Sequence, residues 1–124
     1  IDAIATDHAP HHASLKMLEF DRAPFGIIGL ETALGLAITN LDLPLARLVE
    51  MFSTNPQKIM KVDGWGLYIG SPADLTLFDT EYKWTVNLAD SHSLSRNSPF
   101  DGWKLKGKAM VTIVGGEIVH EEHR

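Results

Sequence analysis

The spacing of hydrophobic residues predicts helices in the first half of the chain. The apolar run at residues 1–6 is short and ends in a polar cluster, which favours a buried strand. Residues 30–41 place apolar side chains three and four positions apart, as on one face of a helix. Residues 44–52 repeat this spacing, and Pro44 suits the first helical turn. We therefore expect a strand followed by two helices.

A third, short helix is predicted to begin at Thr54 and to end near Val62. Thr54 and Gln57 have the spacing of a capping box, and Pro56 is tolerated in a first turn. The glycines of residues 63–66 should end this helix.

In the second half the pattern changes to short strand-like runs separated by turn residues. Residues 75–79 and 83–86 are strand candidates, and residues 87–102 have the composition of a loop. Gly115 and Gly116 separate two further strand-like runs, 108–114 and 117–120, and predict a β-hairpin.

The change of pattern falls between Trp65 and Ser71. We place a domain boundary there, which gives one unit at residues 1–66 and a second at residues 67–124. The chain also begins at Ile1 inside a strand-like run, whose backbone needs a partner strand. We therefore expect the sequence to be the later part of a longer protein.

Composition narrows the class of protein. The chain has 124 residues, 44% of them hydrophobic, which is enough for a core. Its net charge is −5 with both signs interspersed, so a nucleic-acid-binding surface is not expected. The absence of cysteine excludes disulfides and thiolate metal ligands and fits the reducing cytoplasm. We find no apolar run of about 20 residues for a membrane span, and no signal-peptide pattern.

Candidate chemistry is concentrated just after the first predicted strand. Asp7 could bind zinc through oxygen or transfer protons, or it could be a turn residue that bonds its own backbone. His8 and His12 are four residues apart, but Pro10 argues against the helix that would bring them together. His11 completes the cluster.

A second candidate is the turn from Pro24 to Gly29, which precedes the first long helix. Its backbone N–H groups could contact an anionic substrate, or it could simply be a tight entry into the helix. The segment 95–97 could bind an anion or be a solvated loop, and Glu31 is expected to complement the helix dipole.

Taken together, these segments resemble the dihydroorotase family of the amidohydrolase superfamily, in its bacterial long-chain type. The matching stretches follow one another in the same order over nearly the whole chain, which makes the resemblance specific. They are Ala5–His11, Ala23–Ile27, Gly29–Thr32, Thr54–Pro56, Gly70–Leu75 and Ser95–Gly102.

The resemblance implies an α/β fold. The chain would be the C-terminal fragment of a (β/α)8 amidohydrolase barrel, namely its last strand and closing helices. The strands after Gly70 would be the C-terminal part of a small β-sandwich domain.

The resemblance also implies a zinc-dependent reaction, the reversible cyclisation of N-carbamoyl-L-aspartate to L-dihydroorotate in pyrimidine biosynthesis. Asp7 matches an aspartate that binds zinc and moves the proton, and His11 matches the histidine that holds the substrate carboxylate. Phe25 and Gly26 match a turn whose backbone contacts the substrate, whereas His8 and His12 match no ligand. The other metal ligands of the family have no counterpart here, so the chain alone is expected to be inactive.

Two other functions remain open. A hydantoinase or allantoinase would share the barrel and the aspartate of its last strand. A non-catalytic dihydroorotase-like scaffold for aspartate transcarbamoylase would have lost zinc ligands, although Asp7 and His11 are retained here. The intact protein is expected to be a homodimer that acts on a small-molecule substrate.

Overall fold

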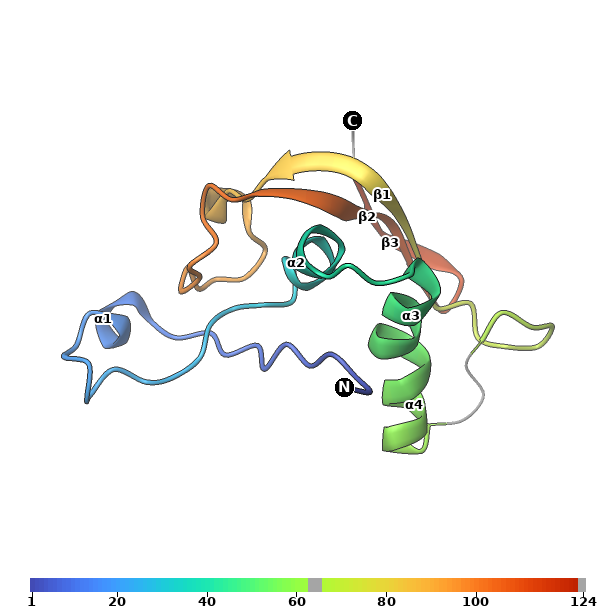
Figure 1. Ribbon diagram of the computed structural model, residues 1–124, viewed down its shortest axis with the longest axis horizontal. Coiled ribbons are helices and arrows are strands. Elements are labelled where there is room, and N and C mark those ends of the chain that lie inside the picture. Colours follow the sequence, from blue (N-terminus) through green and yellow to red (C-terminus); the bar gives the residue numbers. More distant parts are fainter. Residues whose placement is uncertain (63–65, 123–124) are drawn as a thin grey trace.

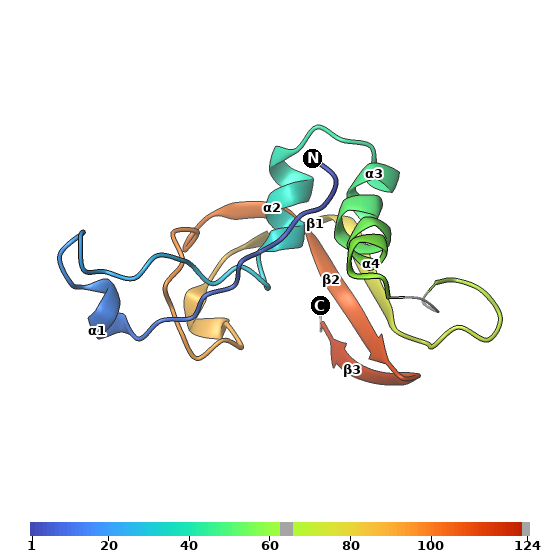
Figure 2. The ribbon, with the colours of Figure 1, turned by 90° about the horizontal axis from the view of Figure 1, so that it is seen from below.

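The structure is a computed structural model that describes residues 1–62 and 66–122. An antiparallel sheet arches over helix α2, and α3 and α4 stack beside it (Figure 1). Figure 2 shows the N-terminal segment running from beside α2 and α3 to α1, which lies away from the sheet. The elements are α1 (Ala13–Lys16), α2 (Ala33–Asn40), α3 (Leu45–Val49), η1 (Glu50–Thr54), α4 (Asn55–Met60), β1 (Leu75–Thr85), η2 (Leu88–Asp90), β2 (Lys104–Val114) and β3 (Glu117–Glu121).

The sheet has three strands in the order β1-β2-β3. The predicted hairpin is confirmed, because Gly115 and Gly116 have φ values of 59° and 87° between β2 and β3. The two strands predicted at 75–79 and 83–86 are instead the single strand β1. A register shift between Asp79 and Lys83 interrupts its pairing with β2, which explains why the sequence pattern breaks there.

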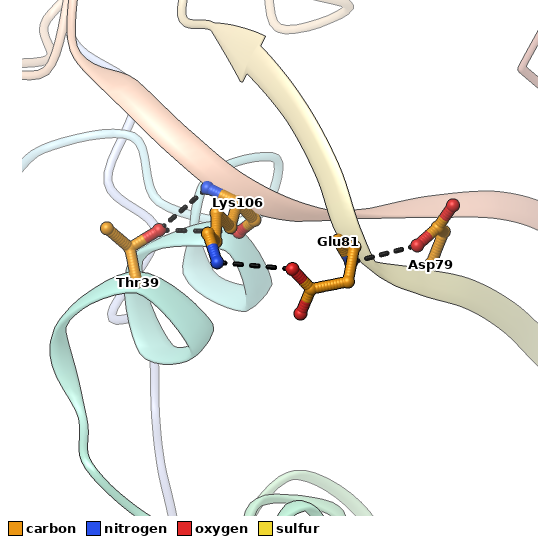
Figure 3. Close-up of polar contacts among 4 residues, drawn as sticks. All are labelled: Thr39, Asp79, Glu81 and Lys106. Atoms are coloured by element: carbon orange, nitrogen blue, oxygen red, sulfur yellow. Dashed lines mark hydrogen bonds and ion pairs between the residues drawn. The ribbon is translucent and has the colours of Figure 1, made fainter.

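Helix α2 packs against β2 at a point of close backbone approach. The Trp84 indole nitrogen donates a hydrogen bond to the Gly107 carbonyl (3.0 Å), and a Cβ on Gly35 of α2 would lie 3.1 Å from the same carbonyl oxygen. At the edge of this contact the Lys106 backbone N–H donates to the Thr39 hydroxyl at 2.8 Å (Figure 3). The small core around this contact consists of Ile28, Ala37, Leu48, Met51, Val86 and Leu105.

The predicted helix start at Thr54 is wrong. Helix α3 continues through the π-helical η1 into α4, and the Thr54 side chain makes no capping hydrogen bond. Pro56 has no N–H to give to the preceding turn, and a local widening to i→i+5 bonding accommodates this loss without ending the helix. The predicted end of this helix at 63–66 falls largely outside the described residues.

The predicted strand at residues 1–6 is not present. A strand requires a ladder of hydrogen bonds, whereas here the Ile4 N–H donates to the Met51 carbonyl (3.0 Å) in an otherwise extended segment. The helix predicted over 30–41 is α2, which begins three positions later at Ala33 because residues 30–32 form a turn. Among the described residues, no helix has the length and apolar character to cross a membrane.

Replacing Gly107 by alanine should destabilise the fold more than the matched Gly70→Ala change. Both glycines have positive φ (84° and 91°), so both variants should lose roughly 1–2 kcal/mol of backbone energy. Only at Gly107 would the new Cβ lie 3.1 Å from the Ile38 Cβ and 2.4 Å from its Cδ1. Overpacking should then add about 1–3 kcal/mol. Urea denaturation of the chain measures both free energies; equal losses would contradict the packing described above.

Candidate functional site

Asp7 lies in an exposed loop with an unusual backbone conformation. Its φ of 44° is in the left-handed region, which non-glycine residues seldom adopt. Within residues 1–62 and 66–122 its carboxylate has no hydrogen bond or ion pair, so the turn-stabilising bond considered above does not form. The carboxylate is therefore open to a ligand, and strain of this kind is often kept at functional sites.

His11, Phe25 and Gly26 are brought together, as the sequence predicted for one site. The His11 Nε2 atom lies 2.8 Å from the Phe25 carbonyl oxygen. A carbonyl can only accept, so Nε2 carries the proton, and Nδ1 has no partner among the described residues. Gly26 has φ 104°, and a Cβ there would lie 2.5 Å from the Ala9 Cβ. The close approach of the two loops thus requires glycine at this position.

The segment 95–97 belongs to the same cluster of loops. The sequence had left open whether this segment binds an anion or is a solvated loop. The Asn97 amide nitrogen donates to the carbonyls of Ala9 (2.9 Å) and Gly26 (3.2 Å). The His11 backbone N–H lies 3.1 Å from the Ser95 hydroxyl and 3.3 Å from the Asn97 side-chain oxygen. The solvated-loop interpretation is therefore wrong. The feature of the sequence that pointed to this segment was the resemblance of Ser95–Gly102 to the dihydroorotase family.

Among the described residues, His8 and His12 belong to no metal-binding group, and both have local structural roles. The His8 Nδ1 atom accepts from the Gly29 N–H (3.1 Å), which fixes the turn before α2. His12 caps α1, with Nδ1 accepting from the Ser14 N–H at 3.2 Å.

Two charged side chains fix the surrounding loops. Lys16 Nζ donates to the carbonyls of Pro24 (2.8 Å) and Gly26 (3.1 Å). The Glu31 carboxylate accepts hydrogen bonds from the loop that leads to Ser95, at residues 91–93. Partial burial raises the pKa of Glu31. These hydrogen bonds and the nearby His92 ring together lower it by more, so the net pKa is below its ordinary value. Glu31 therefore holds this loop as a carboxylate at neutral pH, beyond the dipole role predicted for it.

A cavity of about 510 Å³ lies between α2 and the sheet, but it is separate from this cluster. His8 and Glu31 line it together with apolar residues such as Leu34 and Trp84, whereas Asp7 and His11 do not. The candidate site is thus an open loop surface.

The described residues do not form a complete metal site. No group of three or more histidine, aspartate or glutamate side chains gathers in residues 1–62 and 66–122 in a way that could hold an ion. Zinc sites use three or four protein ligands. Asp7 has the right donor chemistry for one of them.

Comparisons with known proteins agree with the resemblance to dihydroorotases. A dihydroorotase of Solibacter usitatus is 52% identical over 122 residues, which are 95% of this chain and 28% of that protein. A dihydroorotase of Geobacter metallireducens is 49% identical over 124 residues, covering 98% of this chain and 29% of that protein. The chain thus spans less than a third of the length of these relatives.

Solved structures share the fold of the segment. The L-hydantoinase of Arthrobacter aurescens superimposes with a TM-score of 0.90 at 33% identity, over 100% of this chain and 30% of that chain. The D-hydantoinase of a Thermus species gives a TM-score of 0.88 at 28% identity, over 98% of this chain and 28% of that chain. The sequence pattern of the Amidohydrolase family matches residues 1–119. With nearly its whole length matched in sequence and in fold, this chain belongs to the amidohydrolase family.

Proposed function

We propose that the chain is a segment of a zinc-dependent dihydroorotase, which interconverts N-carbamoyl-L-aspartate and L-dihydroorotate in pyrimidine biosynthesis. The proposal is supported by 52% and 49% identity to two dihydroorotases over almost the whole chain. The observation that carries it is the contact between His11 and the turn at Phe25 and Gly26, made by the loop that also contains Asp7. Among the described residues, the Asp7 carboxylate and the His11 Nδ1 atom have no partner, so both are available to a ligand.

His11 is suited to hold the substrate carboxylate through its free nitrogen. Because Nε2 donates to the Phe25 carbonyl, Nδ1 is the atom left for substrate. Nδ1 donates a hydrogen bond to a carboxylate when the ring is an imidazolium, and the pair is then charge-assisted. The backbone of Phe25 and Gly26, fixed against Ala9, provides a rigid edge for the substrate amide.

Asp7 is assigned two roles, as a ligand to zinc and as the group that moves a proton. Zinc held there would supply Lewis-acid polarisation of the amide carbonyl and of water. The Asp7 carboxylate would take a proton from the water whose oxygen adds to the amide carbon, and would give that proton to the ring nitrogen as the C–N bond breaks. The remaining metal ligands are assigned to sequence outside these 124 residues.

The same proposal extends to the architecture. Residues 1–6 would be the last strand of a (β/α)8 barrel, α2 to α4 would be closing helices, and β1 to β3 would belong to a β-sandwich. The extended, unpaired course of residues 1–6 supports this, since a neighbouring strand would complete its ladder. The division into residues 1–66 and 67–124, the cytoplasmic location and the homodimer are also proposed.

The alternative functions have weaker support. A hydantoinase activity rests on structural neighbours at 33% and 28% identity, below the values for the dihydroorotases. A scaffold for aspartate transcarbamoylase requires no working site, yet the Asp7 carboxylate and the His11 ring nitrogen are both open.

The 124-residue chain alone should not turn over dihydroorotate. One carboxylate provides too few ligands to bind zinc tightly. Assaying the purified chain with added zinc tests this, with the full-length product of the gene that encodes it as the positive control. Turnover by the chain at the rate of the full-length protein would contradict the assignment of ligands to other sequence.

Asp7→Asn in the full-length protein should abolish activity. Loss of the proton-transferring group alone should lower kcat about 10²–10⁴-fold. The matched control is Asp2→Asn, an exposed aspartate near the start of the same segment. Steady-state kinetics and zinc content measure the effect; normal kcat in the Asp7 variant would exclude the proposed role.

His11→Ala should raise KM for dihydroorotate about 10- to 100-fold, because a charged hydrogen bond contributes about 1.5–3 kcal/mol. His12→Ala is the control, since His12 bonds only within α1 and its cap. Equal KM values for the two variants would rule out His11 as the carboxylate anchor.

A further inference from the structure

The Asn97 side chain makes three hydrogen bonds to other loops and accepts one from Ser95 in its own loop. Its amide nitrogen donates to Ala9 and Gly26, at 2.9 and 3.2 Å, and its oxygen accepts from the His11 N–H at 3.3 Å. The Asn97 backbone carbonyl also accepts from the Ile28 N–H at 3.1 Å. One residue thus connects the loop after Asp7 with the turn before α2.

Ser95 makes further hydrogen bonds to the backbone of His11. Its hydroxyl accepts from the His11 N–H at 3.1 Å, and its single proton has two acceptors within hydrogen-bond distance, the His11 carbonyl and the Asn97 side-chain oxygen. Ser95 and Asn97 are both partly buried, and they lie 84 and 86 residues after His11 in the sequence. Glu31 fixes the preceding residues 91–93 at the start of α2.

From these contacts we propose that Asn97 and Ser95 are positioning residues that set the affinity for substrate. Together they hold His11 and the Gly26 turn at the separation at which both contact one substrate molecule. They touch no carboxylate of the site, and Asp7 is outside their contacts. Their loss should therefore weaken substrate binding and leave the chemical step nearly unchanged. This inference rests on the function proposed above.

Asn97→Asp is the most specific test, because it replaces the amide NH2 group by a carboxylate oxygen and keeps the shape of the side chain. The carboxylate keeps an acceptor for the His11 N–H but loses both donors, and it faces the carbonyls of Ala9 and Gly26 with like partial charge. Asn87→Asp is the matched control: Asn87 lies in the same loop and also loses a donor, at 2.7 Å to Asp90, but it contacts neither loop of the site. Ser95→Ala and Ser95→Thr form a second pair, in which only threonine retains the hydroxyl.

In the full-length protein, Asn97→Asp and Ser95→Ala should raise KM for dihydroorotate on the order of tenfold, with kcat within about twofold. Ser95→Thr should recover most of the loss, and Asn87→Asp should leave KM unchanged. A residue that merely stabilises the fold would lower the active fraction, and so kcat, at constant KM. That result for Asn97→Asp, or equal KM increases in Asn87→Asp, would overturn the proposal.

Two further measurements separate this proposal from the proposed function. If Asn97 acts through His11, the KM effects of Asn97→Asp and His11→Ala should be strongly non-additive in a double-mutant cycle; full additivity would contradict it. Amide hydrogen exchange at His11 and Ile28 should accelerate in Asn97→Asp and not in Asn87→Asp. If wild-type protein turns over no dihydroorotate, the proposed function fails. Unchanged exchange at these amides would refute the positioning role of Asn97, whether or not the proposed function holds.

Discussion

The candidate site depends on hydrogen bonds that side chains provide to loop backbone. Loop 7–11 and turn 24–29 contain no strand or long helix, so their N–H and C=O groups need partners from elsewhere. The side chains of Asn97, Lys16 and His8 provide those partners. Gly26 permits the approach, because any side chain there would collide with Ala9. The β1–β2 connection and the loops around His11 and Gly26 are thereby joined by polar contacts.

This arrangement gives the sheet a function beyond packing. Residues 87–103 connect β1 to β2, and their course is fixed by the pairing of those strands and by Glu31 at the start of α2. The same connection presents Ser95 and Asn97 to His11. The hydrogen bonds of Glu31 therefore connect the start of α2 to the loop that contacts His11, the proposed substrate anchor. Changes in the packing of α2 on β2 should be transmitted along this connection.

Local sequence patterns predicted the elements whose causes are local. The Gly115-Gly116 hairpin and helix α2 follow from turn chemistry and periodicity. The helix start predicted at Thr54 was wrong, because a proline such as Pro56 that suits a helix start also fits after a π-helical turn within a continuing helix. The role of Asn97 could not be derived from spacing, since its partners lie 71 to 88 residues away in the chain. Likewise, a strand at residues 1–6 needs a neighbour that these residues alone do not contain.

The proposed function requires that the loops around Asp7, His11 and Gly26 bind a cyclic amide that bears a carboxylate. The most direct measurement compares kcat/KM of the full-length protein for dihydroorotate, hydantoin and allantoin under one set of conditions. Of the three, dihydroorotate has the carboxylate that His11 would bind. A preference for dihydroorotate of at least about 10-fold, the scale of one charged hydrogen bond, is the result we predict. Faster turnover of hydantoin or allantoin, or no turnover of dihydroorotate, would contradict the account.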